Sequence, residues 1–276
     1  MSPERVVTYA LGGSTPPQEE NTHPRATRVA ALRIFALGPA WVEKDGVPLA
    51  SSPDWTQKPR ELLFYLLSHP PRTKEQIGLA LWPEASTAQL RSSFHDTLYR
   101  LRRALGGKPW ISFEKGRYAF GRSLPYSYDV EAFEENLAEA RRVQAEAPDR
   151  AIQHLQQATG LYGGDFLEGF DAEWAMVRQE ELGRAYQESL LLLGRLLFAQ
   201  GCHTKAADTY RKVIAHDGFL EEAHRGLMRS YAALGEPGRA LRHYEDLVGL
   251  LGEQLGTSPA PESKALYEHL RSGGEL

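Results

Sequence analysis

The stretch STAQLRSSFHDTLYRLRRAL (residues 86–105), with the pattern WISFEKGRYAF (residues 110–120) close behind it, decides the fold. At about 100° per residue, the apolar residues of the first stretch share one face of a helix. They are Leu90, Phe94, Leu98, Leu101 and Leu105. The opposite face has polar and cationic side chains, namely Gln89, Ser92, Ser93, Asp96, Tyr99, Arg100 and Arg103. Such a helix suits the DNA major groove, although an ordinary surface helix has the same pattern.

Two more helices precede this one, and all three have start and stop signals. The first is expected to begin with Pro59 and to end at Pro70-Pro71. The second begins at Thr73, with Gln76 completing a capping box, and ends at Trp82-Pro83. The third begins at Ser86, with Gln89 in the same role, and ends at Gly106-Gly107.

Strand patterns flank the three helices. Residues 29–49 alternate like short strands, with a turn at Asp45-Gly46, and indicate a small antiparallel platform. After the helices, Trp110–Phe113 and Arg117–Phe120 form a predicted hairpin. The order of sheet, three helices and hairpin predicts a winged helix of the α+β class.

An internal repeat governs the second half of the chain, which is expected to be helical throughout beyond Pro125. Residues 193–210 align with residues 227–244 at an offset of 34, the tetratricopeptide (TPR) period. The aligned pairs include Gly201 with Gly235, Ala206 with Ala240, and Tyr210 with Tyr244. Flanking helices are expected over Asp129–Arg142, Asp149–Tyr162, Asp171–Glu188 and Glu262–Arg271. The repeat predicts an all-α, TPR-like helical repeat domain.

These patterns divide the chain. We expect a disordered N-terminal tail over 1–27, a winged-helix domain over 28–123, a helical domain over 124–272 and a short tail over 273–276. Residues 28–123 hold 15 Lys and Arg against 8 Asp and Glu, a net charge of +7. Residues 124–276 hold 15 against 25, a net charge of −10. A basic block joined to an acidic one indicates that the first binds a polyanion.

Composition narrows the protein class further. No apolar run reaches the roughly 18 residues of a membrane helix, and the first thirty residues lack the order of a secretory signal. Cys202 is the single cysteine, so no disulfide framework is expected. We therefore expect a cytoplasmic protein without a membrane partner.

The residues of the basic block fall into two groups of DNA-binding candidates. Base contacts are expected from the outer face of the third helix, from Gln89, Ser92, Ser93, Asp96 and Arg100. Phosphate contacts are expected from Lys58, Arg60, Arg72, Lys74, Tyr99, Arg103, Lys115 and Arg117. Within the helix, the N-terminal half is expected to determine sequence preference, and Arg100 and Arg103 mainly affinity. Asp96 suits a cytosine amino group and equally suits a solvated surface position.

A family resemblance covers roughly residues 30–272. Five stretches resemble the OmpR-like winged helix of SARP-type activators, namely QKPRELLFYLL (57–67), LWP (81–83), LR (90–91), LYRLRRAL (98–105) and GRY (116–118). Three further features resemble the bacterial transcriptional activator domain, BTAD, namely LYGGDFL (161–167), Trp174 and LGTSPAPE (255–262). The resemblance implies binding to promoter repeats, commonly as a homodimer, and recruitment of RNA polymerase. Thr257 and the Glu-rich helix 131–139 depart from the family pattern and leave the partner of the helical domain open.

Other classes of function have less support. The nine His residues show no metal spacing, no GxSxG motif occurs, and Gly106-Gly107-Lys108 follows a helix where a phosphate loop would precede one. We therefore expect no enzyme, no catalytic residue, no metal and no cofactor. One alternative is an adaptor whose winged helix binds protein and not DNA. Another retains DNA binding and makes the helical domain a sensor of a small molecule or peptide.

Overall fold

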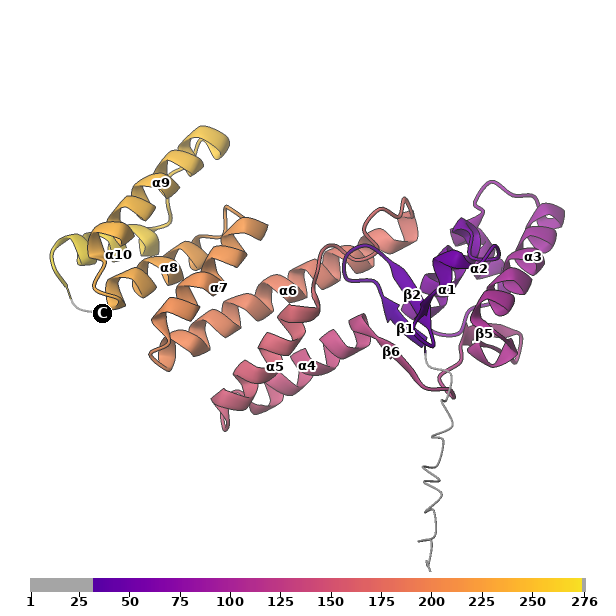
Figure 1. The fold of residues 1–276 in the computed structure, drawn as a ribbon. Coiled ribbons are helices and arrows are strands. Elements are labelled where there is room, and N and C mark those ends of the chain that lie inside the picture. Colours follow the sequence, from indigo (N-terminus) through magenta and orange to yellow (C-terminus); the bar gives the residue numbers. More distant parts are fainter. Residues whose placement is uncertain (1–31, 275–276) are drawn as a thin grey trace, which may run out of the picture.

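The computed structural model describes residues 32–274 and has two parts (Figure 1). A winged helix comes first in the chain, and helices α4 to α10 extend away from it as an elongated stack. This is the predicted fold class. The expected tail over 1–27 lies outside the described residues. Among residues 32–274, no helix combines the length and hydropathy needed to cross a bilayer.

The platform is a four-stranded mixed sheet in the order β3-β2-β1-β6. Its strands are β1 (Leu32–Phe35), β2 (Trp41–Lys44), β3 (Val47–Pro48) and β6 (Tyr126–Tyr128). The first three pair antiparallel, as predicted, but β6 returns to lie parallel to β1. The expectation that everything beyond Pro125 is helical is therefore wrong. Three residues are too few to show an alternating pattern, so β6 is visible only through its pairing.

Three helices form the body of the winged helix, namely α1 (Gln57–Ser68), α2 (Lys74–Leu81) and α3 (Thr87–Leu105). The predicted capping boxes at Thr73 and Ser86 are confirmed, and α3 ends at Gly106 with φ 82°. The predicted start of α1 is wrong by two residues, because Thr56 is its N-cap and Pro59 is its third residue. Proline is tolerated there since the first-turn N–H groups have no partner within the helix.

The wing is the hairpin of β4 (Ile111–Glu114) and β5 (Arg117–Phe120). Its first strand begins one residue later than predicted, because Trp110 ends a short 3-10 turn, η2 (Lys108–Trp110). The two-residue turn needs positive φ at both positions, and Lys115 and Gly116 have φ values of 49° and 78°. A lysine therefore stands at the tip of the wing.

The helical part contains α4 (Asp129–Val143), α5 (Pro148–Leu161), α6 (Glu173–Ala199), α7 (His203–His216), α8 (Glu221–Ala233), α9 (Pro237–Leu255) and α10 (Pro261–Arg271). The helix predicted over 171–188 and the first repeat helix are one continuous helix, α6, because the Ser-Leu-Leu-Leu run at 189–192 contains no helix breaker.

The repeat packs as the 34-residue period predicts. Ala206 and Ala240 are completely buried where paired helices cross. The ring of Tyr210 fills the space beside Gly194 and Gly226, where an added Cβ would lie only 2.8 Å and 2.4 Å from ring atoms. Tyr244, the equivalent residue of the next repeat, stacks on Tyr267 of α10 with 4.4 Å between ring centroids. The small residues thus allow consecutive helices to approach closely.

Asp129, the first residue of α4, connects the winged helix to the helical stack. Its carboxylate oxygens accept hydrogen bonds from the backbone N–H groups of Ala36 (2.8 and 3.0 Å), Leu37 (2.9 Å) and Val130 (2.8 Å). Burial raises the pKa of this carboxyl, and the backbone donors act in the opposite direction. A charged group with this many donors fixes the end of β1 against α4.

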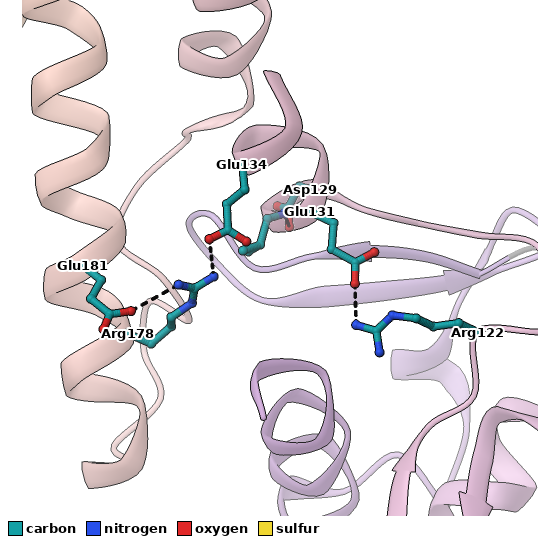
Figure 2. Close-up of polar contacts among 7 residues, drawn as sticks. Arg122, Asp129, Glu131, Glu134, Arg178 and Glu181 are labelled. Atoms are coloured by element: carbon teal, nitrogen blue, oxygen red, sulfur yellow. Dashed lines mark hydrogen bonds and ion pairs between the residues drawn. The ribbon is translucent and has the colours of Figure 1, made fainter. Parts of the chain in front are cut away.

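Ion pairs surround this junction on both sides (Figure 2). Arg178 on α6 bridges Glu134 on α4 at 2.6 Å and Glu181 at 3.2 Å. On the side of the sheet, Arg122 pairs with Glu131 at 2.6 Å. The figure shows Asp129 between these two clusters, so the polar contacts run from the winged-helix side to α6.

The loop before α6 reinforces the connection. Backbone N–H groups of Leu167 and Gly163 donate to the carbonyl oxygens of Ala36 and Leu37 at 2.8 and 3.1 Å. The Phe170 ring packs edge-on against Phe64 of α1 at 5.6 Å between centroids. A single buried apolar cluster spans both parts of the chain. The winged helix is therefore presented by the helical stack in a defined orientation.

The buried imidazole of His224 and the half-buried imidazole of His243 lie between α8 and α9. His224 Nδ1 and His243 Nε2 are 3.0 Å apart, and His224 Nε2 is 3.0 Å from the carbonyl oxygen of Gly218. Burial, with a further contribution from His224, lowers the pKa of His243 to about 4. Both rings are therefore neutral at neutral pH.

Acidification from about pH 7 to about pH 5 is expected to reduce the free energy of unfolding by about 1–2 kcal/mol through His243 alone. The unfolded chain binds this proton near the ordinary pKa of 6.5 and the folded chain only near 4, so stability is lost as pH falls through that window. Urea denaturation of the wild type and of His243→Gln at both pH values measures the difference. Equal losses in the two proteins would contradict this account.

Candidate nucleic-acid interface

The outward face of α3 is open to solvent. Phe94, Leu101 and Leu105 are completely buried, and Leu98 nearly so, which fixes the opposite face outward. Ser92, Asp96 and Arg103 are exposed there, and Tyr99 keeps 60% of its surface. The structure therefore places these predicted contact residues together on one accessible helix face.

Three of the base-contact candidates have partners within α3 or at its N-cap. The Gln89 side-chain oxygen accepts from the backbone N–H of Ser86 at 2.9 Å as part of the capping box, which leaves its amide NH₂ group for other contacts. Asp96 pairs with Arg100 through Oδ2 and Nε at 2.9 Å. Ser93 is half-buried and lies beside α1, lining a hollow with Thr56 and Lys58.

Basic residues of α1 make contacts inside the protein. Lys58 Nζ lies 2.7 Å from the buried carboxylate of Glu61 and donates to the Leu81 carbonyl oxygen at 2.8 Å. Arg60 donates to the carbonyl oxygen of Ala40 at 3.3 Å, and its guanidinium lies 4.9 Å from the centre of the Phe170 ring. Lys58 and Arg60 therefore contribute contacts within the winged helix and at its junction, and the Lys58 side chain remains 41% exposed.

The start of α2 holds the wing in place. Arg72 and Tyr118 exchange backbone hydrogen bonds of 2.9 and 2.7 Å, so the segment before α2 pairs with β5. Arg117 Nη1 donates to the Pro71 carbonyl oxygen at 3.2 Å and to the Gln76 side chain at 3.4 Å. These contacts orient the wing relative to α2 and α3.

The lysines near the start of α2 and at the tip of the wing differ in whether they form ion pairs. Lys74 lies 3.8 Å from Glu75, a distance that allows only a weak surface ion pair. Lys115, at the tip of the wing, is exposed, and no ion pair joins it to the rest of residues 32–274. Lys115 is therefore the cation of the wing that is best placed to meet a phosphate.

A groove of about 620 Å³ lies along α3 beside the base of the wing. Two predicted contact residues, Tyr99 and Arg103, line it. His95, Arg102 and Lys108 line it as well and were not predicted from the sequence. Arg102 also donates to the Ile111 carbonyl oxygen at 2.9 Å and so connects α3 to β4. Two of these residues could have been identified from the sequence. His95 lies on the flank of the helix beside its polar face, and Lys108 lies just before the wing.

The described residues contain little that suggests other chemistry. Within residues 32–274, no group of three His, Cys, Asp or Glu side chains is arranged to hold a metal ion. Burial raises the pKa of Tyr118, so its hydroxyl stays uncharged at the base of the wing. The arrangement offers hydrogen-bonding and cationic groups on one helix face and a lysine on a hairpin beside it.

Comparison with known proteins identifies relatives of this chain. The family model described as "Bacterial transcriptional activator domain" matches residues 128–271. Regulatory protein AfsR of Streptomyces griseus is 31% identical over 268 residues, covering 94% of this chain and 26% of AfsR. Transcriptional regulatory protein MoaR1 of Mycobacterium tuberculosis is 25% identical over 257 residues, covering 89% of this chain and 81% of MoaR1.

A solved structure supports the same fold. Mycobacterium tuberculosis EmbR, in complex with a low-affinity phosphopeptide, superimposes with a TM-score of 0.74 at 22% identity. The match covers 89% of this chain and 66% of the EmbR chain. The chain thus spans about a quarter of AfsR and about two thirds of the EmbR chain.

Proposed function

Because the chain belongs to the SARP-type bacterial transcriptional regulators that contain the bacterial transcriptional activator domain, we propose that it binds promoter DNA sequence-specifically and activates transcription. In this proposal α3 enters the major groove and the wing lies near the adjacent minor groove. The observation that supports it most is the exposed polar face of α3, whose opposite face is anchored in the core.

The proposed contacts divide by position. Ser92, Asp96 and the free amide group of Gln89 face base edges, and Arg100 and the half-buried Ser93 lie beside them. Lys115 meets a phosphate, with Lys74 and Arg117 near the same strand. The internal contacts of Lys58 and Arg60 favour a structural role for both residues. Arg72 contributes mainly by holding the wing.

We assign the helical stack to homodimerisation and to contact with RNA polymerase or an effector, in a cytoplasmic protein. The support is the family to which the chain belongs and the hydrogen-bonded junction that joins the helical stack to the winged helix. A domain held in a fixed orientation beside DNA presents a defined surface to a second protein.

Lys115→Ala is expected to weaken binding to all duplexes alike and to reduce the slope of log K against log salt by about 1, because one phosphate contact is lost. Fluorescence anisotropy titrations at several salt concentrations measure the slope. Lys264→Ala, on α10 at the far end of the stack, is the matched control and is expected to leave it unchanged. An unchanged slope in Lys115→Ala would contradict the proposed position of the wing.

The adaptor hypothesis makes a different prediction. If the winged helix binds protein and not DNA, the chain will show no preference for any duplex over random DNA at physiological salt. Enrichment of a defined motif from a random pool of duplexes by the full chain distinguishes the two hypotheses.

A further inference from the structure

Arg103 on the outward face of α3 has two partners. Its Nε lies 3.3 Å from Oδ2 of Asp54, in the loop before α1. Its guanidinium carbon lies 5.6 Å from the centre of the Tyr99 ring. The Asp54 side chain is only 17% exposed, whereas the Arg103 side chain is 58% exposed. A nearly buried carboxylate therefore restrains an arginine that still reaches solvent.

The atom involved in this contact is informative. The carboxylate approaches Arg103 most closely at Nε, and a carboxylate at Nε leaves the two terminal nitrogens to donate to a second pair of acceptors. Arg100 has the same arrangement with Asp96, at 2.9 Å. The two arginines are three residues apart on one helix, and each has a carboxylate at the same nitrogen.

A carboxylate beside the guanidinium disfavours a phosphate as the next partner. A DNA phosphate at Arg103 would bring a second anion close to Asp54, and like charges in close proximity are costly. The O6 and N7 atoms of guanine are neutral acceptors that match the paired nitrogens of arginine in the major groove. Lys115 provides the contrast, because no acidic side chain within residues 32–274 forms an ion pair with it.

We propose that Arg103 recognises a guanine in the operator and that Asp54 is its positioning residue. This inference rests on the proposed function, and it replaces the phosphate contact that the sequence predicts for Arg103. Asp54 acts through Arg103 and does not itself touch DNA. Tyr99 adds a cation–π contact to the same guanidinium.

The test is selection of bound duplexes from a random pool by the full chain, repeated with Arg103→Ala, Asp54→Ala and Asp54→Asn. The wild type is expected to enrich a motif that includes a G·C pair read by Arg103. Both alanine variants are expected to enrich the same motif without a preference at that one pair. Replacing that G·C pair should cost the wild type about tenfold in affinity and the alanine variants almost nothing, while the other positions keep their preferences. Asp54→Asn retains an oxygen acceptor and should keep part of the preference.

Affinity for duplexes that lack the motif separates positioning from a structural role. Asp54→Ala should bind them at least as well as the wild type, because an anion near the DNA is removed, and thermal denaturation should show an unchanged midpoint. Asp208→Ala removes an exposed ion pair with Arg211 on α7 and serves as the control for loss of an acidic side chain away from α3, with the wild-type motif retained.

The outcomes are distinguishable. A motif unchanged in both alanine variants would overturn the role of Asp54 and Arg103 and leave the proposed function intact. A uniform loss of affinity in Arg103→Ala, with the salt slope lower by about 1, would assign Arg103 to a phosphate. Failure of the wild type to enrich any motif would overturn the proposed function, and this inference with it.

Discussion

Asp129→Ala is expected to lower the free energy of unfolding by about 3–5 kcal/mol. The substitution leaves the N–H groups of Ala36 and Leu37 without their acceptor at a buried position. It also removes a negative charge from the first turn of α4, where the helix dipole favours one. Urea denaturation at neutral pH measures the loss.

Glu135→Ala is the matched control for this prediction, since it removes an exposed carboxylate from the same helix and should change stability by less than about 0.5 kcal/mol. Asp129→Asn, which keeps one side-chain acceptor, should lie between the two. Similar stabilities for Asp129→Ala and Glu135→Ala would show that the junction depends on apolar packing alone.

Ser92→Glu is expected to reduce DNA affinity on the order of a hundredfold, because it places a carboxylate on the outward face of α3 against the negative potential of DNA. The side chain is exposed, so the fold should be unaffected. Anisotropy titration with the enriched duplex, together with thermal denaturation, separates binding from folding.

Ser258→Glu provides the matched control, with the same change at an exposed serine in the loop between α9 and α10, far from α3. It should keep wild-type affinity to within about twofold. An equal loss in both variants would indicate a general charge effect, and no loss in Ser92→Glu would place the DNA on another face.

Local signals in the sequence predict much of the winged helix. The capping boxes at Thr73 and Ser86 and the glycine that ends α3 involve residues within three or four positions of one another, so they are visible without a structure. The apolar stripe of α3 is equally local. The 34-residue repeat extends this to the helical stack, because each unit packs mainly on its neighbours.

The junction could not be predicted in this way. Asp129 accepts from backbone groups 92 and 93 positions earlier in the chain, and no local pattern specifies that contact. The parallel pairing of β6 with β1 and the antiparallel β-bridge between Leu37 and Phe166 are likewise long-range. The acidic character of residues 131–139 is visible in the sequence, but the burial of Asp129 at the start of α4 is not.

Helix periodicity predicts which face of α3 is exposed, but it does not predict the contacts that the side chains of the candidate interface make with other elements. The outward face of α3 follows from the spacing of its apolar residues. The internal partners of Lys58 and Arg60, and the contact of Asp54 with Arg103, depend on tertiary packing. Charge counts identify a basic block, but they do not show which cations are already neutralised inside it.

Sequence-specific DNA binding through α3 is tested most directly with two duplexes, one that carries the motif enriched by the wild type and one in which that motif is scrambled. The measurement is the ratio of their dissociation constants, scrambled to enriched, at about 0.15 M salt. The proposed function predicts a ratio of about a thousand or more for the wild type, falling steeply in Ser92→Glu. A ratio near one for the wild type would contradict the account.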